Sequence, residues 1–309
     1  MRKTLCMFLL FGLSAFGAAS FLERGLLAIG EGNYRAAIQQ FNKEIKQHPK
    51  NARAYIARAD AYYVLANYKN AIDDYTKAIE LNSRLGAKAY ASRAKAHIGL
   101  KDYNKAILDL NVAANLDPSA SIYYDRAAAY YAIGNYKAAI SDYSAGIALD
   151  RNPSAAYGER GRAYVKAGDY AKAIDDFSQL IKIEPQNSSA YNGRGEAYAQ
   201  AGDYAKAISD YSASIKYSPQ EAVAYINRAA IYEKMGDENM MIADYGRAIS
   251  MDRGNLTAYV KRGNAYRDMG KDKEAMDDAQ KACGLGDCAL LERLKADEEA
   301  ASKKTFWFF

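Results

Sequence analysis

Residues 157–185 read YGERGRAYVKAGDYAKAIDDFSQLIKIEP, and this stretch predicts a pair of helices. Tyr157 and Tyr164 lie seven residues apart, which places them on one face of a helix. Gly168 is suited to end that helix, because glycine readily adopts a left-handed backbone. A second apolar face follows, and Pro185 ends it. A hairpin of this size cannot bury its apolar side alone, so it must stack on neighbouring hairpins.

The pattern recurs through most of the chain. An opening aromatic residue returns every 33–35 residues, at Phe21, Tyr55, Tyr90, Tyr123, Tyr157, Tyr191, Tyr225 and Tyr259. A fixed period of this length is the signature of repeat architectures. Counting from three residues before each aromatic residue gives eight units, at 18–51, 52–86, 87–119, 120–153, 154–187, 188–221, 222–255 and 256–289. We therefore predict one solenoid rather than two separate domains.

This pattern resembles the tetratricopeptide repeat. In the sixth unit, Ser214 stands where the family consensus has alanine, and the other consensus places are held by Tyr191, Gly195, Tyr198, Ala207, Tyr211 and Pro219. The resemblance implies an all-α, right-handed superhelical solenoid of eight helix-turn-helix repeats. It also implies a concave groove, lined by the first helix of each unit, that binds a peptide or protein segment. We expect the repeat array at 20–289, followed by a capping helix and aromatic tail at 290–309.

Composition argues against other classes of function. The 309 residues include 27 Tyr but only two His and three Cys, which leaves little material for a metal cluster. The net charge of +5 is too mild to indicate nucleic-acid binding. Neither a nucleophile arrangement nor a phosphate-binding loop is visible in the sequence. We expect no catalytic activity, no cofactor, no metal and no small-molecule substrate.

The N-terminus has the features of a secretory signal peptide. Arg2 and Lys3 precede an apolar run at 5–16, and small residues lead to Ala19. We expect residues 1–19 to be cleaved and the protein to be exported, to the bacterial periplasm or cell envelope. An uncleaved membrane anchor stays open, because the apolar stretch 5–22 reaches the lower limit of a membrane span.

Two charged rows recur with the repeat. A DNA-binding stripe is one interpretation of the arginines, but a semi-buried ion pair within each hairpin explains both rows better. Gln40 replaces the acidic residue of the first unit. The arginines are Arg24, Arg58, Arg93, Arg126, Arg160, Arg194, Arg228 and Arg262, and the aspartates are Asp74, Asp109, Asp142, Asp176, Asp210, Asp244 and Asp278.

Ligand contacts are expected on the first helices, at positions where the repeat's own packing requires no aromatic residue. Tyr63, Tyr124 and Tyr131 hold such positions, although tyrosines there also suit packing on neighbours. A basic surface with tyrosines suits an extended acidic and apolar peptide. The polar candidates on the same face are Lys88, Lys95, Arg162, Lys166 and Asn192.

Three alternatives remain open at the sequence level. A tyrosine-lined groove would also suit a glycan, because sugar faces stack on aromatic rings. The ending TFWFF at 305–309 would suit a structural envelope protein that self-associates, or contact with a membrane surface. Cys283 and Cys288 would form a small disulfide loop in an oxidising compartment, or else remain two unpaired thiols.

Overall fold

The computed structural model describes residues 19–82 and 86–306, and within those ranges the chain forms seventeen helices and no strand. The all-α repeat solenoid predicted from the sequence is confirmed. The predicted signal peptide, apart from Ala19, and the last three residues of the aromatic tail lie outside the described residues. Two compact units divide the chain, Met1–Asp150 and Arg151–Phe309.

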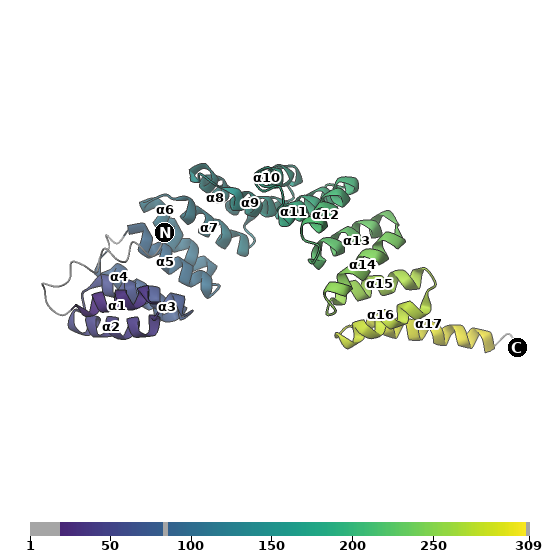
Figure 1. Cartoon of the computed structure of the whole chain (residues 1–309), viewed down its shortest axis with the longest axis horizontal. Helices are drawn as coiled ribbons and strands as arrows, with labels where there is room; N and C mark the ends of the chain where they lie inside the picture. The colour runs from purple at the N-terminus through teal and green to yellow at the C-terminus, as the bar shows by residue number, and fades with distance from the viewer. Residues whose placement is uncertain (1–18, 83–85, 307–309) are drawn as a thin grey trace. The chain divides into compact units, whose positions relative to one another are not determined.

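The first unit holds four helical hairpins (Figure 1). Each hairpin pairs a first helix with a second helix, and the second helix of each of the first three hairpins packs on the first helix of the next one. The helices are α1 (Phe21–Gly30), α2 (Tyr34–Gln47), α3 (Ala52–Val64), α4 (Tyr68–Leu81), α5 (Gly86–Gly99), α6 (Tyr103–Leu116), α7 (Ala120–Ala132) and α8 (Tyr136–Leu149).

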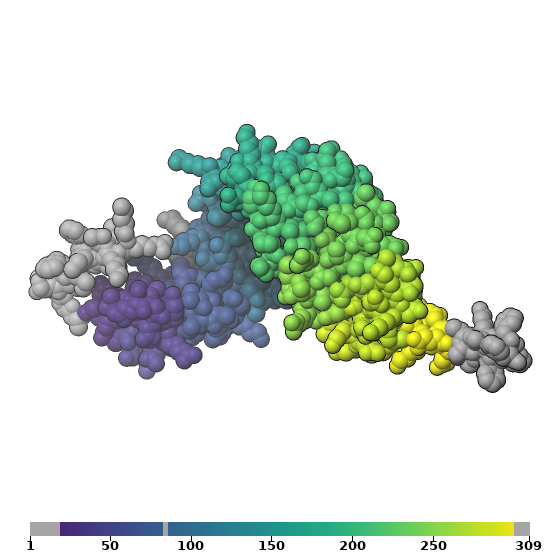
Figure 2. All heavy atoms as spheres, turned by 45° about the vertical axis from the view of Figure 1, so that its right-hand side comes forward, coloured from purple at the N-terminus to yellow at the C-terminus, as the bar shows by residue number. Residues whose placement is uncertain are grey.

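The second unit repeats the same arrangement and ends on an extra helix. Figure 2 shows its atoms, coloured from teal through green to yellow, as one continuous body. The helices are α9 (Ser154–Ala167), α10 (Tyr170–Ile183), α11 (Ser188–Gln200), α12 (Tyr204–Tyr217), α13 (Ala222–Met235), α14 (Glu238–Met251), α15 (Leu256–Asp268), α16 (Asp272–Gly284) and α17 (Ala289–Phe306). Leu290 and Leu294 of α17 are buried against α16, so this last helix covers the apolar end of the array.

Large rings facing small residues form the core of each hairpin. Phe177 of α10 is 1% exposed and lies against Gly161 of α9 and Gly193 of α11. A Cβ atom added at Gly193 would stand 2.5 Å from the Phe177 Cζ atom, closer than real Cβ contacts. Tyr75 and Tyr211 hold the corresponding place in other hairpins. The small residues that recur in the sequence therefore let neighbouring helices approach a ring.

The arginine and aspartate rows form ion pairs within the hairpins. In each pair, Nε and Nη2 of the arginine donate to the two carboxylate oxygens over 2.6–2.8 Å. This two-pronged geometry is the strongest that arginine makes with a carboxylate. The pairs are Arg58–Asp74, Arg93–Asp109, Arg126–Asp142, Arg160–Asp176, Arg194–Asp210, Arg228–Asp244 and Arg262–Asp278.

Several of these arginines also reach back to the preceding hairpin. Their Nη1 atoms donate to a side-chain oxygen on the previous second helix, at Asn42, Thr76, Asn111, Ser178 and Ser212. The first hairpin lacks the carboxylate, and Arg24 there lies over the Phe21 ring at 4.5 Å. The arginine row is therefore part of the architecture, as the ion-pair interpretation predicts.

The turn inside each hairpin requires a left-handed residue. Gly134 and Gly168 take this position with φ of 78° and 81°, which costs glycine nothing. Ala66 and Lys101 hold the same position in the second and third hairpins, with φ of 57° and 61°. An L-residue in this conformation carries strain of about 1 kcal/mol.

Replacing these two residues by glycine is expected to stabilise the first unit. Ala66→Gly and Lys101→Gly should each raise the free energy of unfolding by up to about 1 kcal/mol, because the strain disappears. Urea denaturation followed by circular dichroism measures the change. The reciprocal variant Gly134→Ala should lose a similar amount, and equal stability of all three variants and the wild type would contradict the assignment of strain.

Candidate binding surface on the first helices

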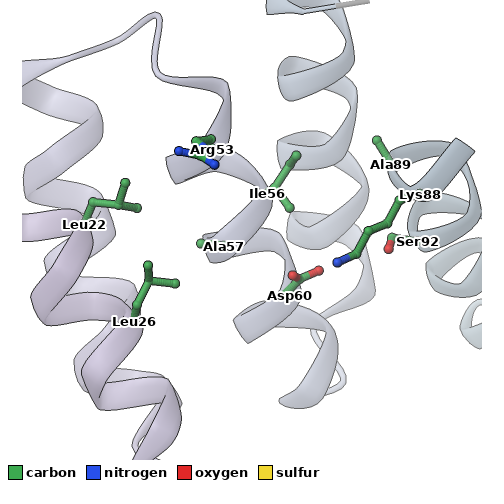
Figure 3. Close-up of a pocket in the computed structure, with 9 residues that line it drawn as sticks. All are labelled: Leu22, Leu26, Arg53, Ile56, Ala57, Asp60, Lys88, Ala89 and Ser92. Atoms are coloured by element: carbon green, nitrogen blue, oxygen red, sulfur yellow. The ribbon is translucent and has the colours of Figure 1, made fainter. Parts of the chain in front are cut away.

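A pocket of 480 Å³ opens on the first helices of the first unit. Figure 3 shows its lining residues, which come from α1, α3 and α5, the first helices of three successive hairpins. They are Leu22, Leu26, Arg53, Ile56, Ala57, Asp60, Lys88, Ala89 and Ser92. Side chains that belong to different repeats thus converge on one cavity, at the surface where the sequence predicts a binding groove.

One side of this pocket is apolar. Leu22 and Leu26 stand one turn apart on α1, and both point toward α3 (Figure 3). Leu26 is 49% exposed, so its methyl groups meet solvent across the opening. Ile56 and Ala57 of α3 lie opposite. An aliphatic surface left open to water in this way favours contact with an apolar side chain.

The other side is polar. Lys88 and Asp60 point toward each other in Figure 3, and Arg53 stands near the start of α3. The Tyr75 hydroxyl donates to Asp60 Oδ1 at 2.5 Å. Burial raises the pKa of Asp60, while the hydrogen bond from Tyr75 and the charge of Lys88 act against that rise. In the described ranges, no carboxylate forms an ion pair with Arg53 or Lys88.

The three candidate tyrosines make packing contacts within their own hairpins. Tyr63 and Tyr131 pack on the first residue of the following helix, with ring centroids 5.5 Å from Tyr68 and 5.4 Å from Tyr136. Tyr124 lies beside Gly146, and its hydroxyl donates to Asp150 Oδ2 at 3.1 Å. All three are half-buried. These contacts are the ones expected if the three tyrosines pack on their neighbours. Their role in ligand binding stays a prediction.

Some of the candidate polar residues have side-chain partners and others do not. Lys95 of α5 pairs with Asp125 of α7 at 3.3 Å, and Arg162 pairs with Glu159 on its own helix. Asn192 of α11 accepts a hydrogen bond from Asn227 of α13 at 3.0 Å. Lys166 is exposed near the end of α9. Two of the expected groove cations, Lys95 and Arg162, are therefore paired with carboxylates, whereas Lys88, Lys166 and Arg53 form no ion pair among the described residues.

First-helix pockets of the second unit are more polar. One of 400 Å³ combines Asn192, Glu196 and Lys234 with Val223, and another of 290 Å³ includes Arg162 and Glu159. Residue types alone do not separate these pockets from the first-unit pocket, because Leu22 and Leu26 look like ordinary helix residues when each is taken singly. Only the two together are distinctive: polar or small residues such as Asp60, Lys95 and Glu196 hold the place of Leu26 in later hairpins, so none of those hairpins has a large aliphatic residue at both places.

Other chemistry-bearing residues lie in structural settings. His97 is 8% exposed at a place that tyrosine holds in sibling hairpins, and burial lowers its pKa. A disulfide joins Cys283 and Cys288, whose Cα atoms are 4.0 Å apart. The described residues contain no cluster of side chains arranged to hold a metal ion. No helix among them is long and apolar enough to span a bilayer.

Comparison with known families identifies the repeat. One family model, described as the tetratricopeptide repeat, matches residues 22–89, 57–121 and 159–222. A second model with the same description matches 120–153, 222–255 and 256–285. Together these matches cover well over half of the chain and follow the period found in the sequence.

Solved structures show the same fold at low sequence identity. The C-terminal part of a repeat-containing protein from Cytophaga hutchinsonii is 22% identical with a TM-score of 0.67, over 78% of this chain and 98% of that one. A tetratricopeptide repeat protein from Parabacteroides merdae is 19% identical with a TM-score of 0.58, over 79% and 97%. YrrB, described as having an unusual peptide-binding site, is 22% identical with a TM-score of 0.54, over 60% and 95%.

Proposed function

The chain belongs to the tetratricopeptide repeat family, and from that premise we propose that it is a non-catalytic scaffold that binds a peptide or protein segment on the faces of its first helices. Repeats of this family typically serve as interaction scaffolds. The observation that carries the proposal is the first-unit pocket, where three repeats converge on an open apolar surface beside two cations. YrrB, which is similar in fold, is described as binding a peptide.

The settings of the charged residues support a binding role over catalysis. Seven arginines are held by aspartates inside the hairpins and are not available to a reaction. The one buried histidine, His97, lies in a packing position. What the first helices leave open to solvent is a surface that recognises a segment by apolar contact and charge.

We further propose that the protein works after export, in a periplasm or cell envelope. The signal-peptide pattern at 1–19 supports this proposal. The Cys283–Cys288 disulfide is consistent with it, because disulfides persist in oxidising compartments. Sequencing the N-terminus of the protein purified from its host tests the idea. A start at Ser20 is expected, and an intact Met1 in the cytosolic fraction would overturn it.

Selection of random peptides tests the binding proposal without assuming a sequence. Displayed twelve-residue peptides would be selected against the purified full chain and then titrated by fluorescence anisotropy. We expect enriched sequences that compete with one another, with Kd values of roughly 1–100 μM, as one shallow surface would give. If repeated rounds enrich no sequence, the proposed function is wrong.

A further inference from the structure

We propose that the first-unit pocket recognises a segment in which a large aliphatic side chain stands next to a carboxylate. This inference rests on the proposed function and adds to it the chemistry and the place of recognition. The pocket has two halves that would bind different groups: an aliphatic wall on α1 and a cationic rim on α3 and α5.

The aliphatic half supplies the anchor. Leu22 and Leu26 form one wall, and Ile56, Ala57 and Ala89 form the other. No charged side chain belongs to this part of the lining, so a polar or charged group placed there would lose its hydration without gaining a partner. A leucine, isoleucine or methionine side chain would instead remove the exposed face of Leu26 from water.

The cationic half favours an acid. Arg53 is the second residue of α3 and Lys88 is the third residue of α5, so both stand where the backbone N–H groups of a helix start add positive potential. The guanidinium of Arg53 is able to bind a carboxylate with two parallel hydrogen bonds. Asp60 is the one acidic lining residue, and its carboxylate already accepts from Tyr75. Lys88 also faces Asp60, so one acid stands against two cations and the rim carries a net positive charge. A basic ligand would therefore be repelled, and an acidic one attracted.

The combination occurs once among the first helices. Leu22 and Leu26 occupy two matched positions of the repeat, and no later hairpin has a large aliphatic residue at both. The other cation on the α5 face, Lys95, is paired with Asp125. The aliphatic wall and the cationic rim therefore occur together only at the first three hairpins of the first unit. We accordingly place ligand recognition at this pocket.

Fluorescence anisotropy with defined peptides tests the two halves separately. The probe is a fluorescein-labelled peptide of sequence GSDLELDSG, titrated with the purified full chain at low salt. Three matched peptides replace its acids by amides, its acids by lysines, or its leucines by serines. We expect the acidic leucine peptide to bind about tenfold or more tightly than each of the three, because each change removes one half of the recognition.

Pocket variants with matched controls locate the site. Arg53→Gln and Lys88→Gln should each weaken binding of the acidic peptide about three- to tenfold, and Leu26→Ser should weaken it about tenfold. Lys69→Gln removes an exposed cation from α4, and Leu108→Ser removes a leucine that is 65% exposed on α6. Neither control should change the affinity. Circular dichroism confirms that each variant keeps its helices.

Each outcome supports or overturns the inference. Loss of affinity in the pocket variants alone, with intact binding in both controls, supports it. Equal binding of the amide and acidic peptides overturns the role of Arg53 and Lys88. No binding of the acidic leucine peptide overturns the inference as a whole. The proposed function still stands in that case if random-peptide selection yields binders, so the two failures are distinguishable.

Discussion

Replacing Asp74 by alanine is expected to lower the free energy of unfolding of the first unit by about 3 kcal/mol. Asp74 accepts two hydrogen bonds of 2.7 Å from Arg58, and its side chain is only 8% exposed. The variant leaves the guanidinium of Arg58 semi-buried without its carboxylate, which costs more than the pair itself contributes. Thermal and urea denaturation measure the loss.

The neighbouring aspartate provides the control. Asp73 precedes Asp74 on α4 but is exposed, so Asp73→Ala should change the free energy of unfolding by less than about 0.5 kcal/mol. A double variant, Arg58→Met with Asp74→Leu, should lose less than Asp74→Ala alone, because no charge is then left unpaired. Equal losses for the Asp73 and Asp74 variants would show that the ion pair does not stabilise the hairpin.

Replacing Gly193 by alanine is expected to destabilise the second unit by about 2 kcal/mol. The new methyl group would stand 2.5 Å from the ring of Phe177, which is 1% exposed and also lies against Gly161 of α9. Helix propensity alone predicts the opposite sign, a gain of about 1 kcal/mol. A loss of stability in Gly193→Ala would show that the close approach of α11 to Phe177 outweighs the higher helix propensity of alanine.

Gly284 serves as the comparison for Gly193. It is also helical, the last residue of α16, but a Cβ atom built there meets nothing within 4 Å. Gly284→Ala should therefore leave stability unchanged or raise it slightly. Denaturation of both variants under the same conditions makes the test. A stabilised Gly193→Ala protein would contradict the packing of Phe177 against α11.

The fold was readable from the sequence because its causes are local and repeated. Glycine or its substitutes at the turn, a ring facing a small residue, and an arginine matched to an aspartate recur in nearly every hairpin. The sequence of each repeat therefore predicts the same hairpin independently of the others. The ion-pair interpretation of Arg58 and Asp74 followed from matched periods alone, and the structure shows both hydrogen bonds.

The site was less readable, because it depends on what each side chain meets across neighbouring repeats. Lys95 and Arg162 look alike in the sequence as free groove cations, yet both are paired with carboxylates. Tyr63 and Tyr131 hold groove positions, but their rings pack on Tyr68 and Tyr136. Leu26 is distinctive in the sequence only together with Leu22, and it becomes a candidate because both side chains point toward α3 across the pocket. Such side-chain pairings are not encoded in the repeat period.

Photo-crosslinking at the first helices tests the central claim most directly. A photoreactive phenylalanine analogue would replace Leu26 in one protein and Leu108 in another, and both would be irradiated with a peptide obtained by unbiased selection. Both leucines are substantially exposed, but Leu26 lines the pocket and Leu108 lies on α6, a second helix. We predict covalent capture of the peptide at position 26 and little at position 108. Capture at 108 with none at 26 would contradict the account.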